Sequence, residues 1–383
     1  MRAAVLYDVG RLAVRDVPRP EPGPGEVLLR PAAVGLCGTD FHIHAGHANY
    51  HFDPRGRAIP LTAHPQILGH EVAATVAEVG AGVADLRPGD RVVIDQGRSC
   101  AGRVERCEYC AAGFSHQCAT YGEHGITGLA GGLADAMVVP AANVIRRGAD
   151  ADGGPLDAAE AALTEPLACV LHALAAARRA ASHVTLDGPA ATRARAILVV
   201  GAGPAGLLFV QALRRVAGFD GAILASDPDP GKRALAARFG ATPIDPTAAP
   251  VVDQVQAATD GRRADWVIEA SGASQALVDL PGVLRKLGTF VLYGHGHRGV
   301  DVGVMNSIQF LEPTFVTPTG ASGGFDADGR PAIYREALRL LERRTIQVAP
   351  IVTHRYASLD AVPAAFAGAH RAPGYVKGVV ELA

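Results

Sequence analysis

The chain has 383 residues, of which 45 are Gly, 26 are Pro and 5% are aromatic. This length predicts two or three domains, and a content of 49% hydrophobic and 19% charged residues excludes a wholly disordered chain. The formal net charge of −2 excludes the broad basic surface that nucleic-acid binding requires, so we expect no nucleic-acid partner.

About the first 150 residues predict an irregular β domain. Short apolar segments separated by Gly and Pro turns predict its strands at residues 3–8, 26–35, 71–80, 90–95 and 136–140. A helix is predicted to begin near Asp157, because Asp157 and Glu160 form a capping pattern. Apolar residues then recur with helical spacing at Leu167, Val170, Leu171 and Leu174.

From Arg195 onward, strand and helix patterns alternate. Strands are predicted at residues 196–200, 221–227, 265–270 and 289–294, with helices at 207–216, 232–240 and 274–288. Such alternation predicts parallel strands joined by crossover helices, that is, an α/β domain with a doubly wound parallel sheet. We place this domain at residues 159–345, closed by an amphipathic helix at 332–344. Residues 346–383 are predicted to return to the first domain as a helix and a strand.

The longest uncharged run, Ala196–Leu213, is just long enough to suggest a membrane span, but several Gly residues and Pro204 interrupt it. We expect a buried strand, a turn and a helix there, and no membrane partner. The segment MRAAVLYDVG lacks the apolar stretch of a signal peptide, so we expect a cytoplasmic protein. In a reducing compartment, six cysteines indicate metal binding or catalysis before disulfides.

A glycine-rich turn follows the predicted strand 196–200 and opens a helix. Its three glycines, Gly201, Gly203 and Gly206, fit the G-x-G-x-x-G pattern of dinucleotide sites, in which the helix N-terminus binds a pyrophosphate. Asp227 ends the next strand, where a carboxylate accepts hydroxyls of the adenosine ribose and repels a 2′-phosphate. We therefore predict NAD rather than NADP, although Lys232 and Arg233 lie close enough to soften that preference. The structural alternative is an ordinary strand-to-helix turn.

Two short segments carry metal-binding side chains. Cys37 lies in LCGTDFH, and His70 and Glu71 lie in GHE. A thiolate, an imidazole and a carboxylate are ligand types of catalytic zinc, which has three protein ligands and one open position. Each residue has a structural alternative: a buried apolar cysteine, a core histidine and a surface carboxylate.

With Glu165 in the segment TEPL, the stretch Gly82–Val92 and the glycine turn, these motifs follow one another as in the zinc-dependent medium-chain dehydrogenase/reductase superfamily. Essentially the whole chain resembles this superfamily, particularly its polyol, sugar and cyclitol dehydrogenases. The resemblance implies a GroES-like catalytic domain at 1–158, completed by 346–383, and a Rossmann-type NAD-binding domain at 159–345. It also implies an active site in the cleft where the two domains meet.

The resemblance assigns roles to individual residues. Cys37 and His70 resemble zinc ligands, Glu165 the third ligand, and Glu71 either a ligand or a neighbour that exchanges with it. Thr39 and His42 match the proton relay of the family.

The implied reaction is zinc-dependent, NAD-linked oxidation of a secondary alcohol of a sugar, polyol or (amino)cyclitol to a ketone, with transfer of a hydride to nicotinamide. The partner would be a small hydroxylated substrate, and the family implies a homodimer or homotetramer. The alternatives are a simple alcohol or amino-alcohol dehydrogenase of the same superfamily, or a non-catalytic NAD-binding protein. The presence of the metal set disfavours a zinc-free enone or quinone reductase.

A second set of cysteines predicts a structural zinc site with four thiolates: Cys100, Cys107, Cys110 and Cys118. The loop after Cys100 is longer than in the family, but lengthening a flexible loop costs little free energy. The alternatives are a three-cysteine remnant without metal and oxidised pairs. Cys169 has no partner by spacing and is predicted to be a core residue.

The loop between His42 and His70 is long and rich in hydrogen-bonding side chains, namely His44, His47, Tyr50, His51 and His64. Such a loop would suit a substrate with several hydroxyls if it lined the pocket. The alternative is a solvated surface loop, so no substrate contact is assigned to any one of these residues.

Overall fold

The computed structural model describes residues 1–101, 105–148, 153–154, 156–181 and 183–382. The chain forms two compact units: unit 1 comprises Met1–Ala168 and Gly320–Ala383, and unit 2 comprises Cys169–Thr319. Unit 1 contains the predicted β domain and unit 2 the predicted parallel sheet, so the α/β fold class is confirmed.

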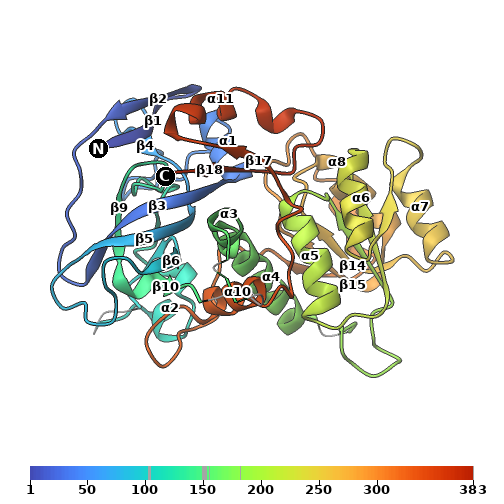
Figure 1. Cartoon of the computed structure of the whole chain (residues 1–383). Helices are drawn as coiled ribbons and strands as arrows, with labels where there is room; N and C mark the ends of the chain where they lie inside the picture. The colour runs from blue at the N-terminus through green and yellow to red at the C-terminus, as the bar shows by residue number, and fades with distance from the viewer. Residues whose placement is uncertain (102–104, 149–152, 155, 182, 383) are drawn as a thin grey trace. The chain divides into compact units, whose positions relative to one another are not determined.

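Unit 1 is built on a seven-stranded sheet. Its order is β10-β6-β5-β3-β18-β17, with β9 also paired to β3. The strands are β3 (Glu26–Leu36), β5 (Glu71–Val79), β6 (Arg91–Ile94), β9 (Met137–Pro140), β10 (Val144–Arg146), β17 (Val352–Tyr356) and β18 (Lys377–Glu381). Strand β18 runs antiparallel to β3 and parallel to β17, so the C-terminal segment, red in Figure 1, lies beside the blue strand β3.

The rest of unit 1 consists of small sheets and short helices. One sheet has the order β2-β1-β4, with β1 (Arg2–Asp8), β2 (Arg11–Asp16) and β4 (Gln66–Ile67), and β7 (Gly97–Arg98) pairs with β8 (Gly122–Glu123). The α-helices are α1 (Gly38–His44), α2 (Glu108–Ala111), α3 (Ala158–Ala162), α10 (Ala332–Glu342) and α11 (Val362–Phe366). Single 3-10 turns lie at Ser115–Gln117, Ala141–Asn143, Leu359–Ala361 and Ala369–Arg371.

The central strands β3 and β5 are buried along most of their length, which explains why they lie in the middle of the sheet. The core of unit 1 includes Val27, Leu29 and Val34 of β3 and Val72 and Val76 of β5. Pro31 is unusual in the middle of a central strand, because it has no N–H to donate to a neighbour. The pairing register with β5 shifts between Pro31 and Ala33, so a bulge accommodates the proline.

Unit 2 is a six-stranded parallel sheet in the order β13-β12-β11-β14-β15-β16. Its strands are β11 (Ala196–Val200), β12 (Ala222–Ser226), β13 (Thr242–Ile244), β14 (Ala264–Glu269), β15 (Leu284–Leu292) and β16 (Thr314–Val316). Its helices are α5 (Pro204–Arg215), α6 (Pro230–Arg238), α7 (Val251–Ala258), α8 (Ser274–Val283) and α9 (Val304–Gln309). Figure 1 shows α5 and α6 in front of this sheet. Every residue of β14 is buried, as expected for a parallel strand covered on both faces.

Some predicted boundaries differ from the structure. The helix predicted over 274–288 ends at Val283, because Leu284 already pairs with Ala264 as part of β15. Strand β13 and helix α7 were not predicted. The helix predicted from Asp157 divides at Leu163 into α3 and α4 (Thr164–Ala180), and the Asp157 side chain accepts from the N–H of Ala159 as predicted for an N-cap.

The division of the chain also bears on the predicted domains. Helices α3 and α10 belong to unit 1, whereas the sequence-based division placed residues 159–345 together. The domain boundaries at 158 and 345 stay a prediction.

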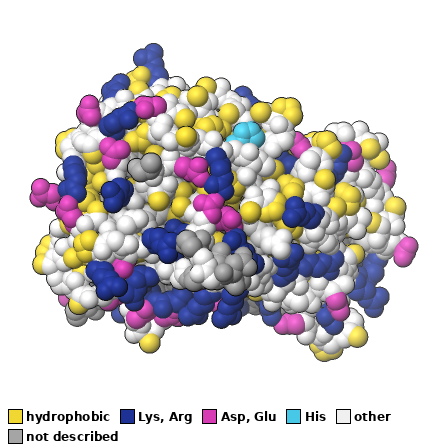
Figure 2. Space-filling model, viewed as in Figure 1, with side chains coloured by type: hydrophobic (Ala, Val, Ile, Leu, Met, Phe, Trp, Pro, Cys, Tyr) yellow, Lys and Arg dark blue, Asp and Glu magenta, His cyan; other side chains and the backbone are white. Residues whose placement is uncertain are grey.

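Within the described part of the chain, one helical stretch, Ala158–Ala180, has the length and apolar character to cross a membrane, but 83% of its most apolar window is buried. This degree of burial is typical of a core helix. The run Ala196–Leu213 forms β11, a turn and part of α5, as predicted. On the face shown in Figure 2, Lys and Arg side chains are interspersed with Asp and Glu, in keeping with the net charge of −2.

Candidate functional site

The pairing of β3 with β5 brings Cys37 close to His70 and Glu71. Gly35 lies opposite Glu71 in the antiparallel register, and Cys37 caps helix α1 directly after β3. A Cβ atom on Gly35 would lie 2.0 Å from Glu71 Oε2, so any larger residue here would displace the Glu71 carboxylate. The Cys37 sulfur, a His70 ring nitrogen and a Glu71 carboxylate oxygen lie within 4.8 Å of one another.

The buried carboxylate of Asp40 supports this cluster. Its Oδ2 accepts from the backbone N–H of Cys37 at 2.9 Å, and its Oδ1 accepts from that of Gly69 at 3.2 Å. The His70 Nδ1 atom lies 3.4 Å from Asp40 Oδ1. Burial opposes the charged form of His70, but Asp40 and Cys37 raise its pKa above the usual value. Sequence analysis gave Asp40 no role, although its position three residues after a helix cap was a signal.

Lys377 provides a positive charge next to the cluster. Its Nζ lies 2.5 Å from Glu71 Oε1, and both side chains are almost completely buried, at 2% and 0% exposure. The other oxygen, Glu71 Oε2, is buried and has no hydrogen-bond partner among the described residues. An unpartnered buried anionic oxygen is unfavourable, and a metal ion would satisfy it. The donor types and this oxygen therefore suit a divalent metal.

Glu165 lies outside this set of converging atoms. It occupies the first turn of α4, is 6% exposed, and its Oε1 accepts from Gln96 Nε2 at 2.9 Å. The structure thus brings together Cys37, His70 and Glu71 but does not place Glu165 with them.

A network of buried polar side chains surrounds Glu165 instead. Tyr334 Oη donates to Gln96 Oε1, and the Gln96 side chain also hydrogen-bonds to Glu123. Burial raises the pKa of Glu123, while the nearby His70 lowers it, so Glu123 lies within electrostatic range of the Cys37 cluster. None of Gln96, Glu123 and Tyr334 was predicted from the sequence, because each stands in a segment without a recognisable motif.

Asp95 lies beside this network. Burial raises its pKa to about 7, the N–H of Gly97 opposes that shift, and the charges of Glu165 and Glu123 add to it. Tyr334 Oη is also within hydrogen-bond range of Asp95. A tyrosine hydroxyl has one proton, and Tyr334 donates it to Gln96 Oε1.

Thr39 and His42 are both half-buried on helix α1, three residues apart and therefore on the same face. The ring of His42 lies 6.0 Å from that of His47. In the histidine-rich loop, burial raises the pKa of Tyr50, and so do the nearby charges of Cys37 and Glu123. Tyr50 therefore lies within electrostatic range of Cys37.

The second cysteine set converges as well. The sulfur atoms of four cysteines lie within 4.8 Å of one another: Cys100, Cys107, Cys110 and Cys118. Backbone N–H groups donate to these sulfurs, from Cys107 to Cys100 Sγ at 3.2 Å and from Cys100 to Cys118 Sγ at 3.3 Å. The N–H groups of Ala119 and Cys110 lower the pKa of the Cys107 thiol to about 6. Such donors stabilise thiolates, the form that binds metal. Cys169 is buried elsewhere, on α4.

The glycine-rich turn joins β11 to α5, with β12 on one side of β11 and β14 on the other. Gly201 has φ of +93°, which favours glycine, and its N–H donates to Ser226 O at 2.7 Å. A Cβ atom on Gly206 would lie 1.8 Å from Gly201 O, whereas one on Gly203 would meet nothing within 4 Å. The space at Gly203 lies at the N-terminus of α5, where a phosphate can approach the backbone.

Asp227 follows β12 and is 7% exposed. Its Oδ2 accepts from the N–H of Ala202 at 2.9 Å, so it is tied directly to the glycine turn. Arg233 donates to the carbonyls of Asp227 and Pro228 and pairs with Asp245 at 2.5 Å. This guanidinium is therefore occupied by partners within unit 2.

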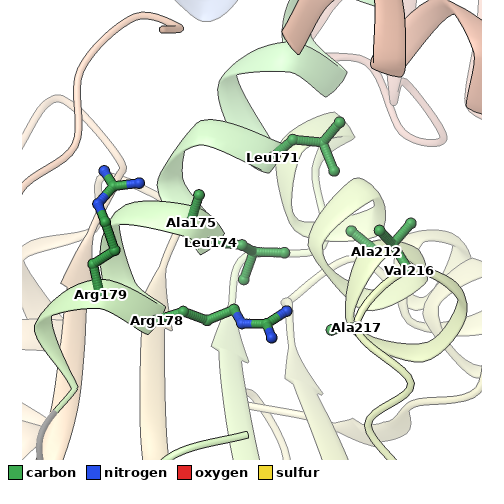
Figure 3. Close-up of a pocket in the computed structure, with 8 residues that line it drawn as sticks. All are labelled: Leu171, Leu174, Ala175, Arg178, Arg179, Ala212, Val216 and Ala217. Atoms are coloured by element: carbon green, nitrogen blue, oxygen red, sulfur yellow. The ribbon is translucent and has the colours of Figure 1, made fainter. Parts of the chain in front are cut away.

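Unit 2 also has a groove of about 310 Å³ between α4 and α5 (Figure 3). Leu174 faces Ala212 and Val216 across it, while Arg179 points away. Arg178, at its edge, pairs with Asp187 at 2.5 Å. The groove contains none of the predicted site residues.

Comparisons with known proteins bear on the whole chain. Residues 23–148 match the family model "Alcohol dehydrogenase GroES-like domain", and residues 158–382 match "Glucose dehydrogenase C-terminus". The chain is 31% identical to L-threonine 3-dehydrogenase of Pyrococcus furiosus over 352 residues, which cover 92% of this chain and 90% of the relative. It is 30% identical to L-galactonate-5-dehydrogenase of Escherichia coli, with 88% and 86% covered.

Among solved structures, a putative zinc-binding dehydrogenase from Sinorhizobium meliloti bound to NADP has a TM-score of 0.79 and 29% identity, with 99% of this chain and 98% of that chain covered. The alcohol dehydrogenase of Aeropyrum pernix has a TM-score of 0.80 at 23% identity, with both chains covered completely. At that identity the likeness concerns the fold.

The glycine turn generates a first prediction. Gly203→Ala should weaken NADH binding at least about tenfold, because the new methyl group blocks the approach of the pyrophosphate. Its thermal unfolding should stay near that of the wild type, since the space is open and φ is −67°. Fluorescence titration with NADH measures the affinity. Gly206→Ala is the control, and it should unfold at a lower temperature because its Cβ meets backbone. Unchanged NADH binding by Gly203→Ala would contradict the assignment.

Asp95 generates a second prediction. Its pKa rises from 3.8 in the unfolded chain to about 7 in the folded chain. The stability that it contributes is therefore fully present below pH 3.8 and is lost as the pH rises to about 7. The free energy of unfolding of Asp95→Asn, minus that of the wild type, should rise by about 2 kcal/mol between pH 5 and pH 7. Above pH 7 this difference should stay constant. Urea unfolding of both proteins at each pH measures this difference. A difference that does not change with pH would show that Asp95 is not protonated on folding.

Proposed function

Because this chain belongs to the zinc-dependent medium-chain dehydrogenase/reductase superfamily, we propose that it is a zinc-dependent, NAD-linked dehydrogenase. Its reaction is the oxidation of a secondary alcohol on a sugar, polyol or (amino)cyclitol to a ketone. The observation that carries this proposal is the convergence of Cys37, His70 and Glu71 in unit 1 of a chain whose unit 2 has the glycine turn of a dinucleotide site.

Cys37 and His70 are the proposed zinc ligands, and a carboxylate is the third. The unpartnered Oε2 of Glu71 supports Glu71 in this role, whereas Glu165 is engaged by Gln96. Glu165 remains the alternative third ligand. In that case Glu165 and Glu71 would exchange with each other at the metal. Zinc, when bound, supplies Lewis-acid chemistry that favours loss of the alcohol proton and stabilises charge on oxygen.

The residues of this chain handle the proton. Thr39 Oγ1 hydrogen-bonds to the substrate hydroxyl, and His42, on the same face of α1, passes the proton towards solvent. Asp40 keeps Cys37 and the loop before His70 in place through two backbone N–H groups. Lys377 pairs with Glu71 Oε1 and orients this carboxylate.

A polyhydroxylated substrate is supported by the polar groups around the cluster. Tyr50 and Glu123 lie within electrostatic range of Cys37 or His70, and carboxylates and phenols are groups that bind hydroxyls. A slot for simple aliphatic alcohols would be lined by apolar side chains. An amino-alcohol is the second candidate, because one relative is an L-threonine 3-dehydrogenase and the buried acids would also suit an ammonium group.

NAD is the proposed cofactor, and it accepts the hydride. The Asp227 carboxylate at the end of β12 is positioned to accept from ribose hydroxyls and to repel a 2′-phosphate. The pairing of Arg233 with Asp245 supports NAD over NADP, because this guanidinium is not available to a phosphate. The Sinorhizobium meliloti structure, however, was bound to NADP, so both cofactors belong in the test.

Assembly and location are part of the proposal. Strand β16 is an edge strand, and exposed apolar side chains lie on or near it, including Phe310 at 82% and Phe315 at 38% exposure. These side chains support a homodimer or homotetramer that uses this edge. Clusters of reduced cysteines support a cytoplasmic location.

The reaction is tested with a substrate panel. Purified zinc-loaded protein is offered polyols, sugars, cyclitols, aminocyclitols, L-threonine and simple alcohols, each with NAD or NADP, and absorbance of the reduced cofactor is followed. We expect turnover of a polyhydroxylated substrate with NAD, and Cys37→Ser should lower kcat/KM at least about a thousandfold. NADH binding without turnover of any alcohol would favour the non-catalytic alternative, and full activity of the zinc-free protein would exclude the proposed mechanism.

The four-cysteine lobe is proposed to hold a second, structural zinc. Metal analysis should therefore give two zinc ions per chain in the wild type and one in Cys100→Ser, because a structural site needs all four thiolates. Cys169→Ser, which changes a cysteine outside both clusters, is the control and should keep both ions. Two zinc ions in Cys100→Ser would remove Cys100 from the site.

A further inference from the structure

The Gln96 side chain lies at the centre of the buried polar network, and all three of its hydrogen-bonding positions are used. It is 2% exposed and lies two residues after the end of β6. Its Oε1 accepts from Tyr334 Oη at 2.5 Å, and its Nε2 donates to Glu165 Oε1 at 2.9 Å. The Gln96 side chain is also within hydrogen-bonding range of Glu123 and lowers the pKa of that carboxyl. An amide has one acceptor atom and two N–H groups, so the match is complete.

These contacts leave the amide only one orientation. Carboxylates accept, so Glu165 and Glu123 must face the NH₂ end, and the Tyr334 hydroxyl must face the oxygen. A flipped amide would place its oxygen against two carboxylates. The Tyr334 hydroxyl therefore selects the orientation in which Gln96 can bind both acids.

Tyr334 is itself held firmly. It is 1% exposed and lies on α10, in the segment that begins after unit 2. Arg330, just before α10, is 6% exposed and donates to the carbonyl of Val144 at 2.6 Å. Val144 belongs to β10, which pairs with β6, the strand that leads to Gln96. The helix that carries Tyr334 and the strand that leads to Gln96 are thus fixed to the same sheet.

We propose that Gln96 and Tyr334 are positioning residues of the active site: Tyr334 fixes the Gln96 amide, and the amide holds the carboxylates of Glu165 and Glu123 in place beside the zinc ligands. This inference rests on the proposed function, because it takes Glu165 as a ligand or exchanging carboxylate. Without the amide, two buried acids would repel each other and Glu165 would lose the partner of its Oε1.

The consequence concerns the metal. Groups that orient metal ligands typically change metal affinity by about ten- to a hundredfold when they are removed. Tyr334→Phe removes one hydroxyl and leaves the ring in its buried position. It should speed the release of the catalytic zinc by about ten- to a hundredfold and leave the zinc of the four-cysteine lobe unaffected.

The experiment compares Tyr334→Phe with Tyr356→Phe in the full-length protein. The Tyr356 hydroxyl is buried in unit 1 and has no hydrogen-bond partner among the described residues, so its loss controls for a missing hydroxyl. Zinc content, the rate of zinc transfer to a chelator, and the visible spectrum of the cobalt-substituted protein are measured, together with kcat and KM. We expect faster release and a changed cobalt spectrum for Tyr334→Phe, and wild-type behaviour for Tyr356→Phe.

The same release rate and cobalt spectrum in Tyr334→Phe and wild type would overturn the inference while leaving the proposed function intact. A wild-type protein that holds zinc only in the four-cysteine lobe would overturn the proposed function and the inference with it. If Tyr334→Phe does not fold, the same measurements are made on Gln96→Met. This variant keeps the side-chain volume and removes both N–H groups of the amide. Retention of catalytic zinc at the wild-type rate by Gln96→Met would likewise refute the positioning role.

Discussion

The antiparallel pairing of β3 with β5 is the constraint on which the candidate active site depends. It places Glu71 opposite Gly35, and the sequence continues from β3 into Cys37 within two residues. Strand β18 pairs with the other edge of β3 and supplies Lys377. Side chains alternate between the faces of a strand, so a slip of one residue in either pairing would turn these groups away from one another. The register therefore determines which side chains meet at the site.

Burial of charge is the second constraint. Glu71 has Lys377 as its counter-charge, but Asp95, Glu123 and Glu165 are held largely by neutral donors such as Gln96 and backbone N–H groups. Burial raises the pKa of Asp95 and of Glu123, so these carboxylates reduce the stability of the fold near neutral pH. Groups that are unfavourable in the folded state yet satisfied by a specific network are typical of functional sites.

The sequence predicted the parts of the site that are local. Cys37, His70 and the glycine turn stand in short contiguous motifs whose spacing is itself the signal, and the strands around them are short apolar segments between Gly and Pro turns. Gln96 and Tyr334 could not be predicted, because their meaning comes from packing between segments 238 residues apart. Helix α10 was predicted from its amphipathic pattern, but a pattern does not say which sheet the helix contacts. The assignment of Glu165 to the metal set came from the family resemblance and stays a proposal, because its side chain is engaged by Gln96.

Lys377 is synthesised long after Glu71, so the parts of the site become available in a fixed order during translation. It lies 306 residues after its partner Glu71. At the usual rate of protein synthesis, about 15 to 60 s separate the emergence of the two residues from the ribosome. During that interval Glu71 is without the counter-charge that it has in the complete fold. The pairing of β18 with β3, which brings Lys377 to Glu71, is therefore among the last contacts of the site that can form.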